Sequence, residues 1–245
     1  MDLEQTPKPQ SKAIRSDITQ LPVLNRRRIF YRKRIQDLIR AVLWIFADVR
    51  VSELENAPLA GPGLVISNHL GDTDSLLAVA YSPAQLDWFV KSELLEFPVL
   101  GKLIDMYGVI WVHRGQPDRA ALRAALQGIE QGRLIALAPE GRESLTGGLE
   151  EGTHGAAYIA IKENIPLYPV TFTGTENKNV YNNMRKFSRT KMSITFGSAF
   201  TLPIGDDRRT AIREGTDRIM SRLAAQLPPE LRGVYLDGTE ATDGG

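Results

Sequence analysis

The chain has 245 residues, 42% of them hydrophobic and 24% charged, a composition that suits one well-cored globular domain and excludes extended disorder. It contains no cysteine, which excludes a disulfide framework, a thiolate nucleophile and a cysteine-ligated metal. The formal net charge is +1, but the first fifty residues hold eleven Lys or Arg and five Asp or Glu, so they carry about +6 and the rest about −5.

A basic stretch opens the first predicted element. It runs from Asn25 to Arg34 and leads into apolar residues at three- and four-residue spacing, with Trp44 near the edge of the stripe: Ile35, Leu38, Ile39, Val42, Phe46 and Val49. The pattern predicts an amphipathic helix that Asn25 caps. The longest apolar run, from Ala41 to Ala47, is far shorter than the roughly 20 residues that span a bilayer. The polar segment before the helix also argues against a cleavable signal.

Two interpretations of this basic helix stay open. Its charged and apolar faces suit in-plane binding to an anionic lipid surface, which makes residues 1–52 a membrane-associating arm. Alternatively, the helix packs on its own domain and leaves a solvated charged face. Nucleic-acid binding is discounted, because the sequence shows no further basic stripe and no helix-turn-helix, zinc or RNA-recognition motif.

From about Gly61, short apolar runs alternate with helical patterns. We expect strands at 63–67, 88–90, 109–112, 134–138, 166–172 and 192–196, and helices at 74–80, 122–129, 155–164 and 212–227. The alternation predicts an α/β fold with a largely parallel central sheet flanked by helices, over residues 53–236. Residues 237–245 are expected to form a loose tail.

The stretch Asn68-His69-Leu70-Gly71-Asp72-Thr73-Asp74 follows the first of these strands. Ligands collect at the carboxyl ends of strands in such sheets. Across a strand-to-helix turn, the Asp74 carboxylate can fold back to one imidazole nitrogen of His69 and leave the other nitrogen free as a base. Asp72 or Thr73 is placed to cap the helix. The alternative is that His69 and Asp74 only bond each other and stabilise the turn.

No nucleophile accompanies this pair, since the sequence has no Gly-x-Ser-x-Gly elbow and no cysteine. A base here would therefore activate a hydroxyl that arrives with the substrate. A lone histidine with two aspartates lacks the paired-histidine spacing of a zinc helix, so no metal is expected. His113 and His154 show no similar surroundings and are assigned to surface or helix-start positions.

Four blocks in order resemble the glycerophospholipid acyltransferase family, which includes the 1-acylglycerol-3-phosphate acyltransferases. The blocks are Asn68-His69-x4-Asp74, Gly108-Val109-Ile110-Trp111-Val112-His113-Arg114, Pro139-Glu140-Gly141-Arg142 and Ile165-Pro166-Leu167-Tyr168-Pro169-Val170. The resemblance covers roughly residues 55–204. It implies that His69, held by Asp74, takes the proton from an acceptor hydroxyl that attacks an acyl thioester, without a covalent acyl-enzyme.

The resemblance also implies the substrate-binding residues: Lys91, Arg114, Glu140, Gly141, Arg142, Pro166 and Pro169. Guanidinium groups suit phosphate, so Arg114 and Arg142 are expected on the acceptor phosphate with Lys91 as a further cation. Glu140 is expected to bind a glycerol hydroxyl or to orient an arginine. Pro166 and Pro169 are expected to shape the strand entry and the wall of the pocket beside the acyl chain.

The third block departs from the family pattern. The family usually has Glu-Gly-Thr-Arg-Ser, whereas this chain has Glu140-Gly141-Arg142-Glu143-Ser144. The expected acceptor is lysophosphatidic acid, and glycerol 3-phosphate, a glycolipid or a non-catalytic lipid-binding scaffold stay as alternatives. The donor is acyl-CoA or acyl-acyl carrier protein, and no cofactor is expected. Because the acceptors reside in the bilayer, the expected location is peripheral, on the cytoplasmic face of the membrane.

Overall fold

A computed structural model describes residues 18–112 and 119–236 of the chain. Its helices and strands follow one another as α1 (Arg26–Phe46), β1 (Ala47–Ser52), β2 (Gly63–Ser67), α2 (Thr73–Tyr81), β3 (Leu86–Lys91), α3 (Leu100–Tyr107), β4 (Ile110–Val112), α4 (Arg119–Glu130), β5 (Leu134–Leu137), α5 (Gly155–Glu163), β6 (Leu167–Thr173), α6 (Asn177–Arg185), β7 (Thr190–Phe196) and α7 (Arg208–Gln226). This is the predicted α/β class.

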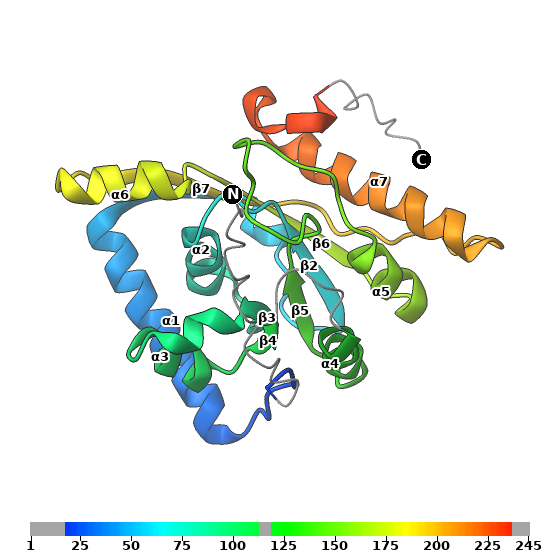
Figure 1. The fold of residues 1–245 in the computed structure, drawn as a ribbon, viewed down its shortest axis with the longest axis horizontal. Helices are drawn as coiled ribbons and strands as arrows, with labels where there is room; N and C mark the ends of the chain where they lie inside the picture. The colour runs from blue at the N-terminus through cyan, green and yellow to red at the C-terminus, as the bar shows by residue number, and fades with distance from the viewer. Residues whose placement is uncertain (1–17, 113–118, 237–245) are drawn as a thin grey trace, which may run out of the picture.

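The strands form one seven-stranded sheet in the order β1-β7-β6-β2-β5-β3-β4 (Figure 1). All neighbouring pairs are parallel except β6 and β7, which are antiparallel. The carboxyl ends of β2, β3, β5 and β6 therefore meet at one edge of the sheet, which we call the carboxyl edge. Because β7 and β1 run in the opposite direction, their amino ends lie at this same edge.

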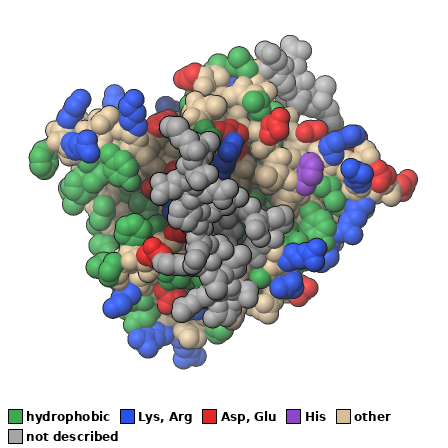
Figure 2. Space-filling view, viewed as in Figure 1, with side chains coloured by type: hydrophobic (Ala, Val, Ile, Leu, Met, Phe, Trp, Pro, Cys, Tyr) green, Lys and Arg blue, Asp and Glu red, His purple; other side chains and the backbone are tan. Residues whose placement is uncertain are grey.

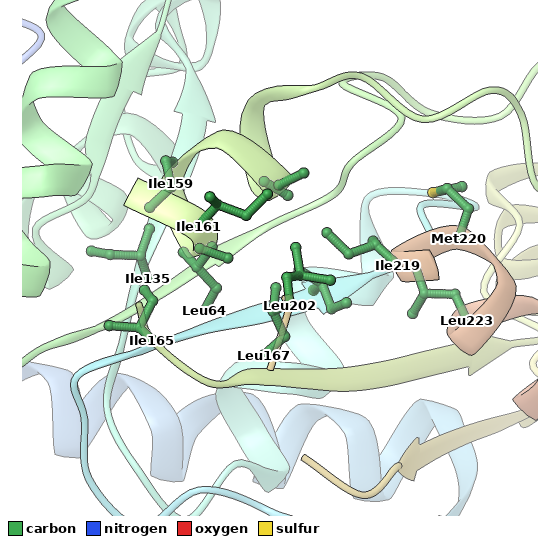
Figure 3. Close-up of a cluster of buried hydrophobic side chains, with 14 of the residues drawn as sticks. Leu64, Ile135, Ile159, Ile161, Ile165, Leu167, Leu202, Ile219, Met220 and Leu223 are labelled. Carbon is green, nitrogen blue, oxygen red and sulfur yellow. The ribbon is translucent and has the colours of Figure 1, made fainter. Parts of the chain in front are cut away.

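Helices cover both faces of the sheet, which explains why all five residues of β2 are buried. On one face, strand residues such as Leu64, Ile135 and Leu167 pack against α4, α5 and α7 (Figure 3). The alternate residue Val65 points to the other face, where α1, α2 and α3 pack. The near-continuous apolar runs of the central strands follow from this double coverage.

Helix α1 begins where the sequence predicts, and the Asn25 side chain accepts a hydrogen bond from the Arg28 backbone N–H at 2.8 Å. Its inward face carries Ile35, Ile39 and Leu43. The outer face leaves large apolar side chains exposed, among them Phe30, Leu38, Val42, Trp44 and Ile45. The predicted single apolar face is thus divided between a packed side and an exposed side.

Arg32 does not lie on the basic surface that the sequence suggests. It is 1% exposed, forms an ion pair with buried Asp87 and donates to the backbone oxygen of Tyr107 at 2.9 Å. A buried guanidinium needs such partners because an unpaired buried charge is very costly. This residue therefore anchors α1 to the sheet and to α3, and it is unavailable to lipid headgroups.

The structure contains three elements that the sequence did not predict, and it ends α1 earlier than expected. The apolar pattern of α1 continues to Val49, but the helix ends at Phe46 and the chain becomes strand β1, which pairs with β7 from Ala47 onward. The first 52 residues therefore contribute a strand to the central sheet as well as a helix. Helices α3 and α6 were not predicted.

No helix in residues 18–112 and 119–236 has the length and apolar character to cross a membrane. Arg114, His113 and the 237–245 tail lie outside the described residues. The expectations for these positions therefore stay predictions. His154 occupies the position before α5, as expected, and its Nδ1 lies 3.1 Å from the Thr216 hydroxyl.

Candidate active site

His69 and Asp74 meet in the turn between β2 and α2. The Nδ1 atom of His69 lies 3.0 Å from Oδ2 of Asp74, so the predicted contact is present. The same oxygen accepts the backbone N–H groups of Leu70 at 2.7 Å and Gly71 at 3.0 Å. Asp74 sits in the first turn of α2 and is 3% exposed. This network fixes the carboxylate and holds the imidazole in one orientation.

Asn68 ties the turn to the neighbouring strand. Its side-chain amide donates to the backbone oxygen of Phe172 at 2.9 Å, and its carbonyl accepts from the Phe172 N–H at 2.8 Å. These two bonds continue the β2–β6 pairing one residue past Ser67, where the backbone of β2 turns away. His69 therefore starts from a fixed point of the sheet.

Glu140 holds the turn from the other side. Its Oε1 accepts the backbone N–H of His69 at 3.1 Å, and its Oε2 accepts that of Glu150 at 2.8 Å. Glu140 thus bonds main chain rather than orienting an arginine, which corrects that part of the sequence expectation. Burial raises the pKa of Glu140 to about 7, although both amide donors act in the opposite direction.

A pocket of about 410 Å³ opens at the carboxyl edge beside this turn. This volume lies within the range of small-molecule sites. Polar groups at the pocket include His69, Asp74 and Lys91. The wall is mainly apolar and comes from several elements: Trp88, Phe89, Leu94, Leu122, Ile159 and Phe172. The site thus combines a histidine–aspartate pair with a surface suited to a hydrocarbon group.

Lys91, at the end of β3, lines the pocket between two carboxylates. Its Nζ lies 3.8 Å from Asp72 Oδ1 and 3.8 Å from Glu143 Oε1. Asn177, the first residue of α6, joins the same group by donating to Glu143 at 3.1 Å and accepting from the Asp72 backbone N–H at 3.0 Å. Asp72 precedes α2 as predicted, but its carboxylate makes no capping bond there.

Arg142 is placed differently from the expectation. Its guanidinium donates twice to Glu150 Oε2, at 2.9 and 2.6 Å, and the side chain is 58% exposed. The backbone N–H of Leu145, and then the hydrogen bonds from Arg142, hold the pKa of Glu150 below its usual value. Gly141 and Glu143 line the pocket, but Arg142 is not one of the lining residues.

The two prolines of the fourth block also lie away from the pocket wall. Pro166 precedes β6, and its carbonyl accepts from the Leu64 N–H at 3.0 Å near the amino end of β2. Pro169 is inside β6 opposite Ile66, and its carbonyl accepts from Gly197 at 2.8 Å. Both shape the strand and its pairing, but neither forms the acyl-side wall as expected. Phe172, further along β6, reaches the pocket instead.

Sequence reasoning missed several residues of the site, namely Asn68, Asp72, Glu143, Glu150 and Asn177 in the contacts described above. Asn68 and Glu143 stand within the quoted blocks, so their positions were visible but their partners were not. Nothing in the sequence around Asn177 indicated a site residue, because Asn177 is close to the site only through the position of β6, which precedes it. Over the described part of the chain, no group of three or more His, Asp or Glu side chains is arranged to hold a metal ion.

Comparison with known proteins gives consistent matches. A solved structure, the 1-acyl-sn-glycerophosphate (LPA) acyltransferase PlsC from Thermotoga maritima, superposes with a TM-score of 0.59 at 26% identity over 80% of each chain. A 1-acyl-sn-glycerol-3-phosphate acyltransferase of Brassica napus, BAT2, chloroplastic, is 30% identical over 59% of this chain and 44% of its own length. The enzyme of that name from Borreliella burgdorferi is 28% identical over 59% of this chain and 60% of its own length.

The chain therefore spans about half the length of these curated relatives. The family model described as Acyltransferase matches residues 48–173, more than half of the chain. That range starts in β1 and ends with β6, so it contains the His69 turn, Lys91 and the Glu140 segment. By this match, the chain belongs to the Acyltransferase family.

Proposed function

We propose that this chain moves a fatty acyl group from a thioester donor to the free hydroxyl of lysophosphatidic acid in phospholipid biosynthesis. Its relatives are named for that reaction. The donor is acyl-CoA or acyl-acyl carrier protein. One observation carries the proposal: His69 is bonded through Nδ1 to Asp74 at the mouth of an apolar pocket. Within the described residues, no hydrogen bond engages its Nε2.

In the proposed reaction, Asp74 accepts from Nδ1–H and so leaves Nε2 unprotonated. Nε2 takes the proton of the acceptor hydroxyl while its oxygen attacks the thioester carbonyl carbon. The tetrahedral intermediate collapses with cleavage of the carbon–sulfur bond. The protonated His69 returns its proton to the departing thiolate, so the products are the ester and the free thiol. No acyl group is attached to the protein.

Fewer described residues are placed to bind the acceptor phosphate than to activate its hydroxyl. Lys91 is the described cation in the pocket, and Arg114, expected to assist it, lies outside the described residues. Glu143 and Asp72 flank Lys91 and reduce its attraction for a phosphate. This observation favours a second candidate, an uncharged glycolipid acceptor, with the same base. Glycerol 3-phosphate would meet the same carboxylates.

We further propose a peripheral location on the cytoplasmic face of the membrane, with α1 against the lipid surface. The outer face of α1 carries exposed basic residues in its first half, Arg26, Arg27, Lys33 and Arg34, and the exposed Trp44 near its end. Arg32 is excluded from this group by its buried ion pair. Each exposed cation near anionic lipid contributes on the order of 1 kcal/mol.

The test is thioester consumption in vesicles that contain lysophosphatidic acid, with acyl-CoA and acyl-acyl carrier protein as separate donors. Wild type and His69→Ala are compared, and His154→Ala serves as a control because that ring bonds Thr216. We expect acceptor-dependent turnover that falls at least about a hundredfold in His69→Ala, the lower range for loss of a general base.

The possible outcomes separate the candidates. Equal turnover in wild type and His69→Ala would show that His69 is not the base. Turnover with a monoacylated glycolipid but not with lysophosphatidic acid would select the second acceptor. No turnover with either donor and any of these acceptors would reject the enzymatic function in favour of a lipid-binding scaffold.

A further inference from the structure

Helix α6 and the turn after it form a second basic segment. From Asn177 to Gly205 the chain has no acidic residue and holds Lys178, Arg185, Lys186, Arg189 and Lys191. Over the rest of the chain beyond the first fifty residues, acids outnumber basic residues. The concentration of positive charge at one place suits contact with an anionic surface.

An apolar row begins on this helix and continues into the turn after it. Tyr181, Met184 and Phe187 are spaced by three residues and are 51%, 43% and 95% exposed. Tyr181 and Met184, three residues apart within α6, lie on one side of that helix, and Phe187 follows in the turn. Figure 2 shows hydrophobic side chains gathered over the left of the molecule, where α1 and the far end of α6 lie in Figure 1, with Lys and Arg above and below them.

Phe187 is costly for the fold. Its φ is +52°, in the left-handed region that favours glycine, and the turn is closed by a bond from its N–H to Met184 at 3.1 Å. Its side chain is nearly fully exposed and so gains little from packing. A large aromatic residue in this strained, exposed position is not explained by folding. Such outliers point to a function at that position.

The turn lies at the carboxyl edge, together with the pocket. Because β7 and β1 run against β6, Thr190 of β7 pairs with Ala47 of β1 at that edge. Arg189 donates to the Ala47 backbone oxygen, so the turn touches the end of α1. The exposed Trp44 belongs to this last part of α1. Phe187 and the outer face of α1 thus contribute to one side of the molecule.

The other end of the apolar row reaches the pocket mouth. The Tyr181 hydroxyl donates to Asp72 Oδ2 at 3.4 Å, and Asn177 bonds both Asp72 and Glu143. Asp72 and Glu143 line the pocket. The row runs from Tyr181 and Met184 on α6 to Phe187 in the turn after the helix. It therefore connects the pocket mouth with the outermost aromatic side chain of the turn.

We propose that α6 and its turn are a second bilayer contact, which inserts Phe187 and Met184 among the acyl chains of an anionic leaflet. Arg185 and Lys186 lie against the headgroups, and the Tyr181–Met184–Phe187 row leads a lipid from the leaflet to the pocket. The second part of this proposal, entry of a lipid substrate into the pocket, rests on the proposed function. The vesicle contact itself does not depend on turnover.

The test uses the full chain and sedimentation with two kinds of vesicle, one of pure phosphatidylcholine and one with a third of phosphatidylglycerol. Phe187→Gly removes the ring and relieves the backbone, so we expect unchanged or higher thermal stability and vesicle affinity about tenfold lower on both vesicles. Arg185→Gln/Lys186→Gln is expected to lose more than tenfold on the anionic vesicles only.

A matched control is Leu59→Ala, because Leu59 is 80% exposed and lies in the segment before β2, away from the carboxyl edge. We expect this variant to bind vesicles like wild type. Unchanged vesicle affinity in Phe187→Gly would overturn the proposal. So would an equal loss in Leu59→Ala, or a loss of the charge variant on neutral vesicles. A change of oligomeric state by light scattering, without a change in vesicle binding, would instead assign the surface to a second copy of the chain.

Turnover separates this inference from the proposed function. With a short-chain, water-soluble lysophosphatidate and donor, Phe187→Gly is expected to match wild type, because the dyad is untouched. Loss of turnover there would mean that the substitution damages the site, which would overturn the surface role. If wild type shows no turnover with any acceptor while Phe187→Gly still loses vesicle affinity, the bilayer contact stands and the enzymatic proposal fails.

Discussion

At the scale of single residues, Glu140 shows how one carboxylate joins two distant segments. It accepts the backbone N–H groups of His69 and Glu150, 71 and 10 residues away in the chain. Only an acceptor with two free oxygens can serve both donors, so glutamine would keep one bond and lose the other. We therefore assign Glu140 to positioning the His69 turn.

The raised pKa of Glu140 makes a prediction for stability. Its usual value is 4.5 and the folded value is about 7, so the folded state binds more protons between these pH values and its free energy of unfolding falls as pH rises through that window. The difference is about 3 kcal/mol at most. Denaturant unfolding at several pH values should show this fall in wild type but not in Glu140→Gln. Parallel curves for the two proteins would contradict the assignment.

Lys91 lines the pocket and Arg142 does not, so substitutions at these two residues test which cation binds the acceptor. We predict that Lys91→Met raises KM for lysophosphatidic acid about tenfold or more, the effect of losing a charged hydrogen-bond partner. Arg142→Gln should change KM less than about twofold, because Arg142 is committed to Glu150 on the exposed side. Steady-state kinetics on vesicles would check both. An equal rise in the two variants would place Arg142 on the acceptor after all.

The residues that sequence reasoning placed well are those whose partners are close in the chain. Asp74 reaches His69 across five residues of one turn, so the order of the residues was enough to predict the contact. The direction of Arg142 depends on Glu150, eight residues on, at the far side of a loop. No periodicity describes such a loop, so the sequence did not reveal that Arg142 would pair with Glu150.

At the scale of elements, α1 combines an exposed basic and apolar surface with a buried anchor. Arg32 holds it to Asp87 of β3, and Arg133 approaches the same carboxylate at 3.5 Å. We predict that Arg32→Met lowers the free energy of unfolding by about 3–5 kcal/mol, since it leaves Asp87 buried with a weaker partner. Chemical denaturation would measure this loss.

The matched control for Arg32 is Lys33→Met, one residue along the same helix and exposed. It should change stability by less than about 0.5 kcal/mol. Arg32→Met combined with Asp87→Leu removes the unpaired charge and should recover part of the loss. A loss below about 1 kcal/mol in Arg32→Met would show that α1 is not anchored through this pair.

The strength of the local hydrophobic pattern decided which helices and strands could be predicted from the sequence. Strand β2 was predicted at its observed bounds because its apolar run is too short for a helix and is bounded by turn residues, which is typical of a strand buried on both faces. Strand β1 was absorbed into the apolar pattern of α1, since Val49 continues the helical spacing by chance. Helix α6 went unnoticed because it is polar and mostly exposed, with Val180 as its one buried residue.

At the scale of the whole molecule, the reversal of β7 and β1 determines what lies together. In a fully parallel sheet, the amino ends of β1 and β7, and with them the last residues of α1 and α6, would lie at the edge opposite the pocket. In the observed order, the amino ends of β1 and β7 share an edge with the carboxyl ends of β2, β3 and β5. Strand composition alone does not encode this direction, so the sequence predicted a largely parallel sheet without locating the exception.

The pair of bonds between Asn68 and Phe172 has a consequence for the energetics of turnover. A side-chain amide here completes the pairing of two central strands, so the His69 turn is ordered by the same interactions that order the sheet. The conformational entropy of the His69 turn is lost when the chain folds. Orienting the imidazole therefore adds nothing to the activation barrier of each catalytic cycle. We therefore expect the His69 turn to stay ordered for as long as the central strands stay paired, without a melting step of its own.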